Sequence, residues 1–347
     1  MLMTNKQIFY LCYSKNSNIN SKMKSILGIG NALVDILATV PNDILLQKYA
    51  LPLGSMQHVN EQKSNDILKD LAKLGCERIA GGSAANTING TARLGLKSSF
   101  IGKIGNDDLG HFFKTDQQVN SINPQLLIGK SSTGRAIVLI NNDAERTFAT
   151  YLGAAIEMTA DDLSESLFDS YHFFHVEGYL VQNHDLIRRA MEIAQSKKML
   201  ISLDMASYNV VNENRGFLTE ILSNYVDIVF ANEDEAKAFT GKEPEDASKE
   251  FAKICSIAVV KTGDKGSLVQ KGDELFRIKP ISIIPIDATG AGDIYASGFL
   301  YGLAHELPLD KCGAIGSLCA GNVVEVIGPK MNEERWTKIH SEIKKIM

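Results

Sequence analysis

One stretch near the end of the chain combines a glycine turn with two carboxylates, Asp287-Ala-Thr-Gly-Ala-Gly-Asp293. An apolar run over 281–286 precedes it, and small and apolar residues follow it at helical spacing. This pattern predicts the end of a strand, a turn and the start of a helix. The first turn of a helix has unpaired N–H groups and a positive dipole, and glycines allow close approach, so the turn could bind a phosphate.

Asp293 is the unusual residue of this turn, because a carboxylate repels a phosphate. Its presence makes sense if it takes a proton from the group that attacks the phosphorus atom. With the amides of Gly290, Ala291 and Gly292 stabilising the negative charge, the stretch would support phosphoryl transfer to a hydroxyl. A simple N-terminal cap explains Asp293 equally well. This stretch alone therefore leaves both interpretations open.

Composition excludes several classes of function. The chain has 347 residues, of which 44% are hydrophobic and 22% charged, and this balance is typical of a soluble globular protein. A net charge of −5 without a basic block argues against a nucleic-acid partner or an anionic membrane surface. The cysteines are scattered and form no CxxC pair, which predicts free thiols, a cytoplasmic location and no zinc site.

The first 22 residues differ from the rest of the chain. A short apolar run over 8–13 is followed by a segment rich in Ser, Asn and Lys. The run is too short for a membrane span or for the core of a signal peptide. We therefore expect a disordered extension, or an over-long start, over 1–22 and one folded domain over 23–347.

Polar residues follow the first predicted strand, which begins at Ser25. Asn31 and Asp35 lie on its C-terminal side, where open α/β sheets place ligands. The stretch is not a dinucleotide fingerprint, because Leu33 occupies the third glycine position. Asp35 could equally be a turn or capping residue.

A second glycine turn, Gly81-Gly-Ser-Ala-Ala-Asn86, precedes a predicted helix. Gly81 and Gly82 allow the backbone to approach a ligand, Ser83 is a plausible N-cap, and Asn86 follows one turn later. These mixed donors and acceptors suit a polyol with several hydroxyls. A glycine turn with ordinary capping explains the same pattern.

The order of predicted elements indicates the fold class. Residues 36–60 and 131–153 have β character, and we expect them to pair as a small sheet that covers a site. From residue 154 on, strands and helices alternate. The alternation predicts an α/β fold with a mostly parallel sheet and helices on both faces.

Two polar turns in this second half could face a nucleotide. Asn232 and Glu235 lie one helical turn apart and could hold a hydrated Mg²⁺, although an acidic first helical turn is the simpler explanation. Lys261-Thr-Gly-Asp-Lys-Gly266 could follow the nucleotide or be only a hairpin turn. The chain has no GxxxxGK[ST] and no HRD, DFG or HExxH motif. If ATP is used, its phosphate site must therefore be the turn over 290–293.

These motifs, in this order, resemble the PfkB, or ribokinase-like, family of carbohydrate and nucleoside kinases from about residue 24 to the end. The family signature D-T-x-G-A-G-D is matched over 287–293, except that Ala288 stands where Thr is usual. Residues 81–86 and 102–110 match the N-terminal glycine signature, and Asn232 and Glu235 match N-x-x-E. The start over 30–35 and the insertion over 41–59 are more similar to the adenosine-kinase branch.

The resemblance implies a ribokinase-like fold with a small β-sheet lid, and transfer of a phosphoryl group from ATP to an alcohol. Asp293 would be the base, and the amides of Gly290, Ala291 and Gly292 the anion hole. The implied contacts to sugar or nucleoside hydroxyls are Asn31, Asp35, Gly81, Gly82, Ser83 and Asn86. The implied nucleotide contacts are Asn232, Glu235, Lys261, Thr262, Gly263 and Gly266, and we add Asn322 from an apolar predicted helix. Glu235 would hold Mg²⁺ through water, and Asp287 matches the position near the K⁺ that many members use.

The acceptor and the assembly stay open. A nucleoside needs a flat apolar slot, whereas a sugar needs more polar partners; Phe148, Phe173, Phe174 and Arg135 could serve either, with a slight preference for a ribose-containing acceptor. We expect a monomer or a homodimer. Two other classes remain, a catalytically idle sugar or nucleoside sensor and a dinucleotide-binding dehydrogenase. The intact site motifs argue against the first and the incomplete glycine fingerprint against the second.

Overall fold

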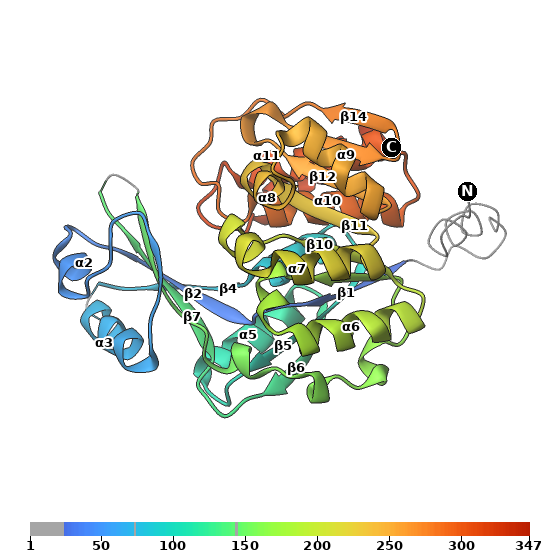
Figure 1. Ribbon diagram of the computed structural model, residues 1–347. Coiled ribbons are helices and arrows are strands. Elements are labelled where there is room, and N and C mark those ends of the chain that lie inside the picture. Colours follow the sequence, from blue (N-terminus) through green and yellow to red (C-terminus); the bar gives the residue numbers. More distant parts are fainter. Residues whose placement is uncertain (1–23, 73, 143–144) are drawn as a thin grey trace.

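The computed structural model describes residues 24–72, 74–142 and 145–347, so the expected extension over 1–22 lies outside the described residues. The described residues form two sheets (Figure 1). From edge to edge, the strands of the larger sheet are β14 (Glu274–Ile278), β13 (Ser267–Lys271), β12 (Ile257–Lys261), β11 (Ile228–Asn232), β10 (Leu200–Asp204), β9 (Phe173–Val176), β1 (Ser25–Ile29), β5 (Lys97–Ile104) and β6 (Ile122–Ile128).

The larger sheet is parallel from β12 to β6, and only β13 and β14 run antiparallel to their neighbours. Its central strands are buried on both faces, which explains why they read as continuous apolar runs. In β11, Ile228 and Phe230 join one core cluster while Val229 and Ala231 join the other. The expected mostly parallel sheet is confirmed.

Helices cover both faces of this sheet, as expected. One face packs against α6 (His184–Ser196), α7 (Tyr208–Asn224), α8 (Glu233–Thr240) and α9 (Pro244–Ile254). The other packs against α4 (Ser83–Arg93), α5 (Asp108–Val119), α10 (Ala291–Ala304) and α11 (Leu309–Val323). Helix α12 (Glu333–Ile346) lies against α11. Among the described helices, none has the length and apolarity needed to cross a bilayer.

The smaller sheet projects from one side of the molecule (Figure 1). Its strands, in order, are β3 (Met56–His58), β8 (Arg146–Tyr151), β7 (Gly134–Ile140), β2 (Leu33–Thr39) and β4 (Glu77–Gly81). One face packs against α2 (Ile44–Lys48) and α3 (Glu61–Leu71) through residues such as Ala149. Because side chains alternate along a strand, Phe148 and Thr150 lie on the opposite face. We call this sheet the lid; β4 is a member that the sequence analysis did not include.

The sequence-based prediction was wrong over 281–286, which is not a strand. Strand β14 ends at Ile278, and the chain then runs irregularly to α10. Pro280 and Pro285 lack the N–H groups that a ladder needs, and Ile284 is 80% exposed. The amides of residues 286 and 287 instead donate to the carbonyl of Val324. The glycine turn is thus positioned by the segment after α11.

Candidate active site

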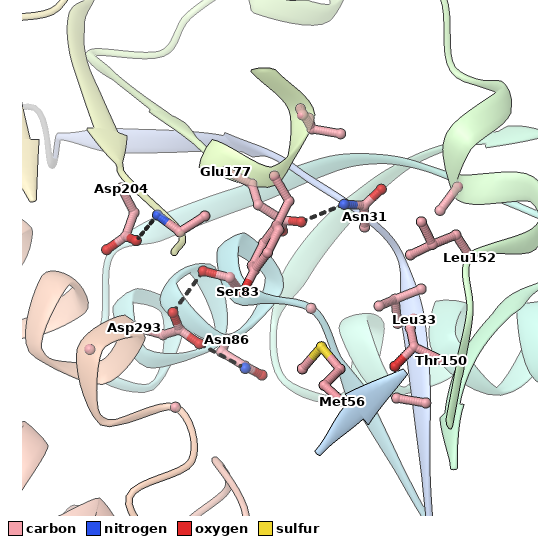
Figure 2. Close-up of a pocket in the computed structure, with 18 of the residues that line it drawn as sticks. Asn31, Leu33, Met56, Ser83, Asn86, Thr150, Leu152, Glu177, Asp204 and Asp293 are labelled. Carbon is pink, nitrogen blue, oxygen red and sulfur yellow. Dashed lines mark hydrogen bonds between the residues drawn. The ribbon is translucent and has the colours of Figure 1, made fainter. Parts of the chain in front are cut away.

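A cavity of about 650 Å³ lies between the lid and the carboxyl ends of the large-sheet strands (Figure 2). The expected site residues that line it are Asn31, Asp35, Gly82, Ser83, Asn86, Asn232, Glu235, Lys261, Gly290, Gly292 and Asp293. The expected residues that do not line it are Gly81, Thr262, Gly263, Gly266, Asp287, Ala291 and Asn322. The fold therefore gathers segments that are up to 262 residues apart, from Asn31 to Asp293, around one cavity.

The turn before α10 depends on its glycines. Gly290 has a left-handed backbone with φ +74°, and a Cβ there would lie 2.6 Å from the Cβ of Pro329. A Cβ on Gly292 would lie 2.9 Å from Nζ of Lys261. The amide of Ala291 donates to the carbonyl of Ala288 at 3.1 Å, so it is already engaged in this structure. The glycines thus bring the start of α10 against the cavity, with the amide of Ala291 paired inside the turn.

Asp293 is held by two side chains from α4, which packs against α10. The hydroxyl of Ser83 donates to Oδ1 at 2.7 Å and the amide of Asn86 donates to Oδ2 at 3.0 Å, as Figure 2 shows. Burial, and then the charge of Asp204, raise the pKa of Asp293 to about 7, although the hydrogen bonds from Asn86 and Ser83 lower it. A base with this pKa suits proton abstraction near neutral pH. Ser83 and Asn86, expected to contact substrate, here orient this carboxylate.

Glu177 is a buried carboxylate that the sequence analysis missed. It follows β9, and it accepts hydrogen bonds from Nδ2 of Asn31 at 2.6 Å and from the amide of Ala84 at 3.1 Å. Burial raises its pKa to about 7. The contact fixes the amide of Asn31, whose Oδ1 is buried without a partner among the described residues. The rule that ligands bind beyond the carboxyl ends of parallel strands could have found Glu177.

The carboxyl group of Asp35 lies so close to Gly81, just before α4, that no side chain fits there. A Cβ on Gly81 would lie 2.6 Å from Oδ2 of Asp35, and a Cβ on Gly82, whose φ is +103°, would lie 2.2 Å from the carbonyl oxygen of Asn31. Burial raises the pKa of Asp35 from 3.8 to about 7, although the charges of Lys330 and Arg146 lower it. The carboxyl group lines the cavity at the base of the lid.

Asn232 and Glu235 form a capping box at the start of α8. The backbone N–H and the side-chain amide of Asn232 donate to Glu235 at 2.8 and 2.7 Å, and the amide of Glu235 donates back at 2.8 Å. Burial, and then the charge of Asp204, raise the pKa of Glu235 to about 7. The helix cap, which the sequence analysis considered the simpler explanation, is present, and the pair also lines the cavity.

Lys261, at the end of β12, pairs with a second carboxylate that the sequence analysis missed. Its Nζ lies 2.8 Å from Oδ2 of Asp204, which ends β10. Burial alone would raise the pKa of Asp204, but Lys261 holds it below its ordinary value. The amide of Ala206 donates to Oδ1 of Asp204 at 3.0 Å and fixes the carboxylate. Asp204 and Lys261 thus form a buried ion pair in the wall of the cavity.

The remaining expected nucleotide contacts lie away from the cavity. Thr262 and Gly266 close the tight turn into β13 with a 2.9 Å hydrogen bond, which is the hairpin alternative. Asn322 is buried within α11, where its Nδ2 donates to the carbonyl of Leu318 at 2.9 Å. Their role toward a nucleotide stays a prediction.

Asp287 binds a lid residue that the sequence analysis did not select. Nη1 of Arg146, in β8, lies 2.7 Å from Oδ2 of Asp287, and the amide of Gly328 donates to the same oxygen at 2.6 Å. The amide and hydroxyl of Thr289 donate to Oδ1. In this structure a guanidinium and N–H groups surround the carboxylate, and K⁺ at this position stays a prediction. Arg146 links the lid to the glycine turn.

The four side chains considered for acceptor recognition separate in the structure. Phe148 lines the cavity, whereas Phe173 and Phe174 are buried in the core of the large sheet. Arg135 is a buried residue of the lid strand β7, and its side chain donates to Ser64 of α3. Only Phe148 of these four is placed to contact an acceptor in the cavity.

A buried carboxylate beside a glycine turn at a helix start, next to a small β-sheet, is an arrangement that fits phosphoryl transfer to a hydroxyl. The family model described as pfkB family carbohydrate kinase matches residues 67–335, and the chain belongs to this family. It is a phosphotransferase with an alcohol as acceptor, as the resemblance implied. This assignment sets the dehydrogenase interpretation aside.

Known relatives include both nucleoside and sugar kinases. The crystal structure of adenosine kinase from Sinorhizobium meliloti is 32% identical, with a TM-score of 0.82 over 92% of this chain and 99% of that one. A probable sugar kinase from Rhizobium etli is 29% identical, with a TM-score of 0.83 over 94% and 99%. Adenosine kinase 2 of Arabidopsis thaliana is 26% identical over 330 residues, which are 87% of this chain and 94% of that protein. The ribokinase-like fold is confirmed.

Proposed function

We propose that the protein transfers the γ-phosphoryl group of ATP to a hydroxyl of a nucleoside, with adenosine as the first acceptor to test. The observation that carries the proposal is the carboxylate of Asp293, held by Ser83 and Asn86 beside the glycine turn. This geometry combines a proton acceptor and an anion site within one helical turn.

The proposed reaction uses groups of this chain in two roles. Asp293 takes the proton of the acceptor hydroxyl, the hydroxyl oxygen attacks the γ-phosphorus, and ADP leaves. The amides of Gly290, Ala291 and Gly292 stabilise the charge on the moving phosphoryl group, although the amide of Ala291 must first leave the carbonyl of Ala288. Arg146, which joins the lid to the turn, is positioned to close the lid over the reactants and exclude water.

The apolar half of the cavity supports a nucleoside rather than a free sugar. Leu33, Met56, Phe148 and Leu152 face the cavity from the lid and from the segment after β8, and Tyr179 adds an aromatic ring on the other side. A flat base would bury these surfaces, whereas a sugar alone would leave them exposed. The name of the Sinorhizobium meliloti relative, an adenosine kinase, agrees with this choice.

Mg²⁺ fits this site only through water. Both oxygens of Glu235 already accept hydrogen bonds from Asn232, so the pair can receive the waters of a hydrated ion more readily than the ion itself. When bound, Mg²⁺ would neutralise part of the phosphate charge. Asn232 and Glu235 would orient its water shell at the start of α8.

The deciding experiment measures ADP release from MgATP with a panel of nucleosides, pentoses, hexoses and sugar phosphates, with and without K⁺. We expect turnover with adenosine or another nucleoside, and a loss of about 10²–10⁴-fold in Asp293→Asn with acceptor binding kept. Turnover with sugars alone would refute the nucleoside acceptor. Acceptor binding without ADP release in the unaltered protein would establish the sensor interpretation instead. Light scattering will distinguish a monomer from a homodimer.

A further inference from the structure

The cavity is acidic for a site that is to hold a triphosphate. Among the described residues that line it, Lys261 is the only lysine or arginine. The carboxyl groups in the same wall are Asp35, Glu177, Asp204, Glu235 and Asp293. These groups repel phosphates unless bound protons, Mg²⁺ or Lys261 offset them. The exact place of the Lys261 ammonium therefore matters for binding the anion.

The ammonium group lies directly against the glycine turn. A Cβ on Gly292 would be 2.9 Å from Nζ of Lys261, and Gly292 belongs to the first turn of α10. The lysine side chain is only 15% exposed. A lysine has three N–H donors, and the described contacts use one of them, toward Asp204. Two donors remain for the oxygens of a phosphoryl group at the turn.

Fold stability alone does not explain why the cation of this pair lies at the start of α10. A cation at the N-terminal end of a helix is at the unfavourable end of the helix dipole. A buried ion pair is also often no more stabilising than apolar side chains of the same size. The ammonium of Lys261 lies at the start of α10, and its pair with Asp204 is buried, with 15% and 8% of the two side chains exposed. What the pair does provide is a positive charge at a turn built to receive an anion.

Asp204 is well placed to control where that charge lies. Its Oδ1 is fixed by the amide of Ala206 at 3.0 Å, and its Oδ2 accepts from Lys261 at 2.8 Å (Figure 2 shows the first contact). Asp204 ends β10 and Lys261 ends β12, with β11 between them, so both side chains arise from a rigid sheet. The lysine is thus held across one strand toward the turn.

We propose that Asp204 is a positioning residue that holds the Lys261 ammonium against the glycine turn, where Lys261 binds the γ-phosphoryl group of ATP. Asp204 acts only through Lys261. The inference rests on the proposed function for the identity of the anion, and it adds the role of Asp204 and the particular phosphate that Lys261 contacts.

A binding experiment tests the phosphate contact without any turnover. Calorimetry measures the affinity of the protein for two nucleotides in the presence of Mg²⁺: the non-hydrolysable ATP analogue AMP-PNP, and ADP. Lys261→Met should weaken the binding of AMP-PNP by about 10–100-fold, which is the contribution of a charge-assisted hydrogen bond, and leave the binding of ADP nearly unchanged. An equal loss for both nucleotides, or no loss, would overturn the contact. Because Lys261→Met leaves Asp204 unpaired, the double variant Lys261→Met/Asp204→Asn serves as the folded control.

A kinetic cycle tests the positioning role. With the accepted nucleoside, Lys261→Met should lower kcat by about 10²–10³-fold, and Asp204→Asn should lower it by about 10²-fold through misplacement of the ammonium. KM for the acceptor should not change in either variant. The double variant should be no slower than Lys261→Met alone.

The outcomes of this cycle separate the two proposals. Losses that multiply in the double variant would show that Asp204 acts independently of Lys261, and would refute its positioning role. A loss of kcat in Asp204→Asn that is fully explained by a lower Tm would also refute the positioning role. If the unaltered protein phosphorylates no acceptor, the proposed function fails, while the calorimetric comparison still decides whether Lys261 contacts the γ-phosphoryl group.

Discussion

Asp35 is predicted to destabilise the ligand-free protein at neutral pH, so its replacement by asparagine should stabilise the fold while impairing the site. The pKa of this carboxyl is raised from 3.8 to about 7 by burial. A raised pKa means that, between these two values, the folded state retains a proton that the unfolded state has lost. Stability therefore falls as the pH rises through this window.

The size of the effect follows from the two pKa values. One pKa unit corresponds to about 1.4 kcal/mol. With 3.8 in the unfolded state and about 7 in the fold, Asp35 lowers the stability by roughly 1.5 kcal/mol at pH 5 and roughly 4 kcal/mol at pH 8. Asparagine does not ionise, so the advantage of Asp35→Asn over the unaltered protein should grow by about 2.5 kcal/mol between these pH values. This difference does not include the packing of the asparagine, which is the same at every pH.

Urea unfolding of both proteins at pH 5, 6, 7 and 8, without ligand, measures this difference directly. The same variant should raise KM for the acceptor, because Asp35 lines the cavity. If the difference in the free energy of unfolding between Asp35→Asn and the unaltered protein is the same at every pH, the reasoning is refuted. Such a result would show that Asp35 ionises in the fold as it does in water. A stability difference that shrinks as the pH rises would refute it as well.

Three further predictions concern other parts of the site. Since the pKa of Asp293 is about 7, kcat/KM should fall about tenfold per pH unit below pH 7, and a pH profile of Asp293→Asn should lack this limb. Glutamine cannot accept hydrogen bonds from both Asn31 and Ala84 as Glu177 does. Glu177→Gln should therefore raise KM for the acceptor about tenfold with little change in kcat. Initial rates measured against acceptor concentration will show whether kcat falls instead. Arg146→Gln leaves Asp287, 7% exposed, without its ion pair and should lower the free energy of unfolding by about 3 kcal/mol. The matched control is Arg188→Gln, because Arg188 pairs with Glu220 at the surface, where the two side chains are 37% and 40% exposed. Loss of this pair should lower the free energy of unfolding in urea by less than about 1 kcal/mol. Equal losses in the two variants would contradict the argument from burial.

Features that depend on local backbone geometry could be predicted from the amino-acid sequence. Glycine is needed at Gly82 and Gly290, which have positive φ, and a cap is needed at the start of α8; both requirements can be recognised from neighbouring residues. Alternating strands and helices likewise indicated the parallel sheet. The apolar run over 281–286 was misread because Pro285 within it and Pro280 just before it remove ladder donors, and a short apolar run does not specify a partner strand.

The contacts between distant side chains depend on how the elements pack, and local sequence could not predict them. Asp293 is 210 residues from Ser83, and Arg146 is 141 residues from Asp287; these contacts follow from the packing of α4 on α10 and from the fold of the lid. Glu177 follows the end of β9 and Asp204 ends β10, neither within a sequence motif, and their roles depend on which strands become neighbours. Burial, which raises the pKa of Asp293, is likewise a property of the assembled fold rather than of any local segment.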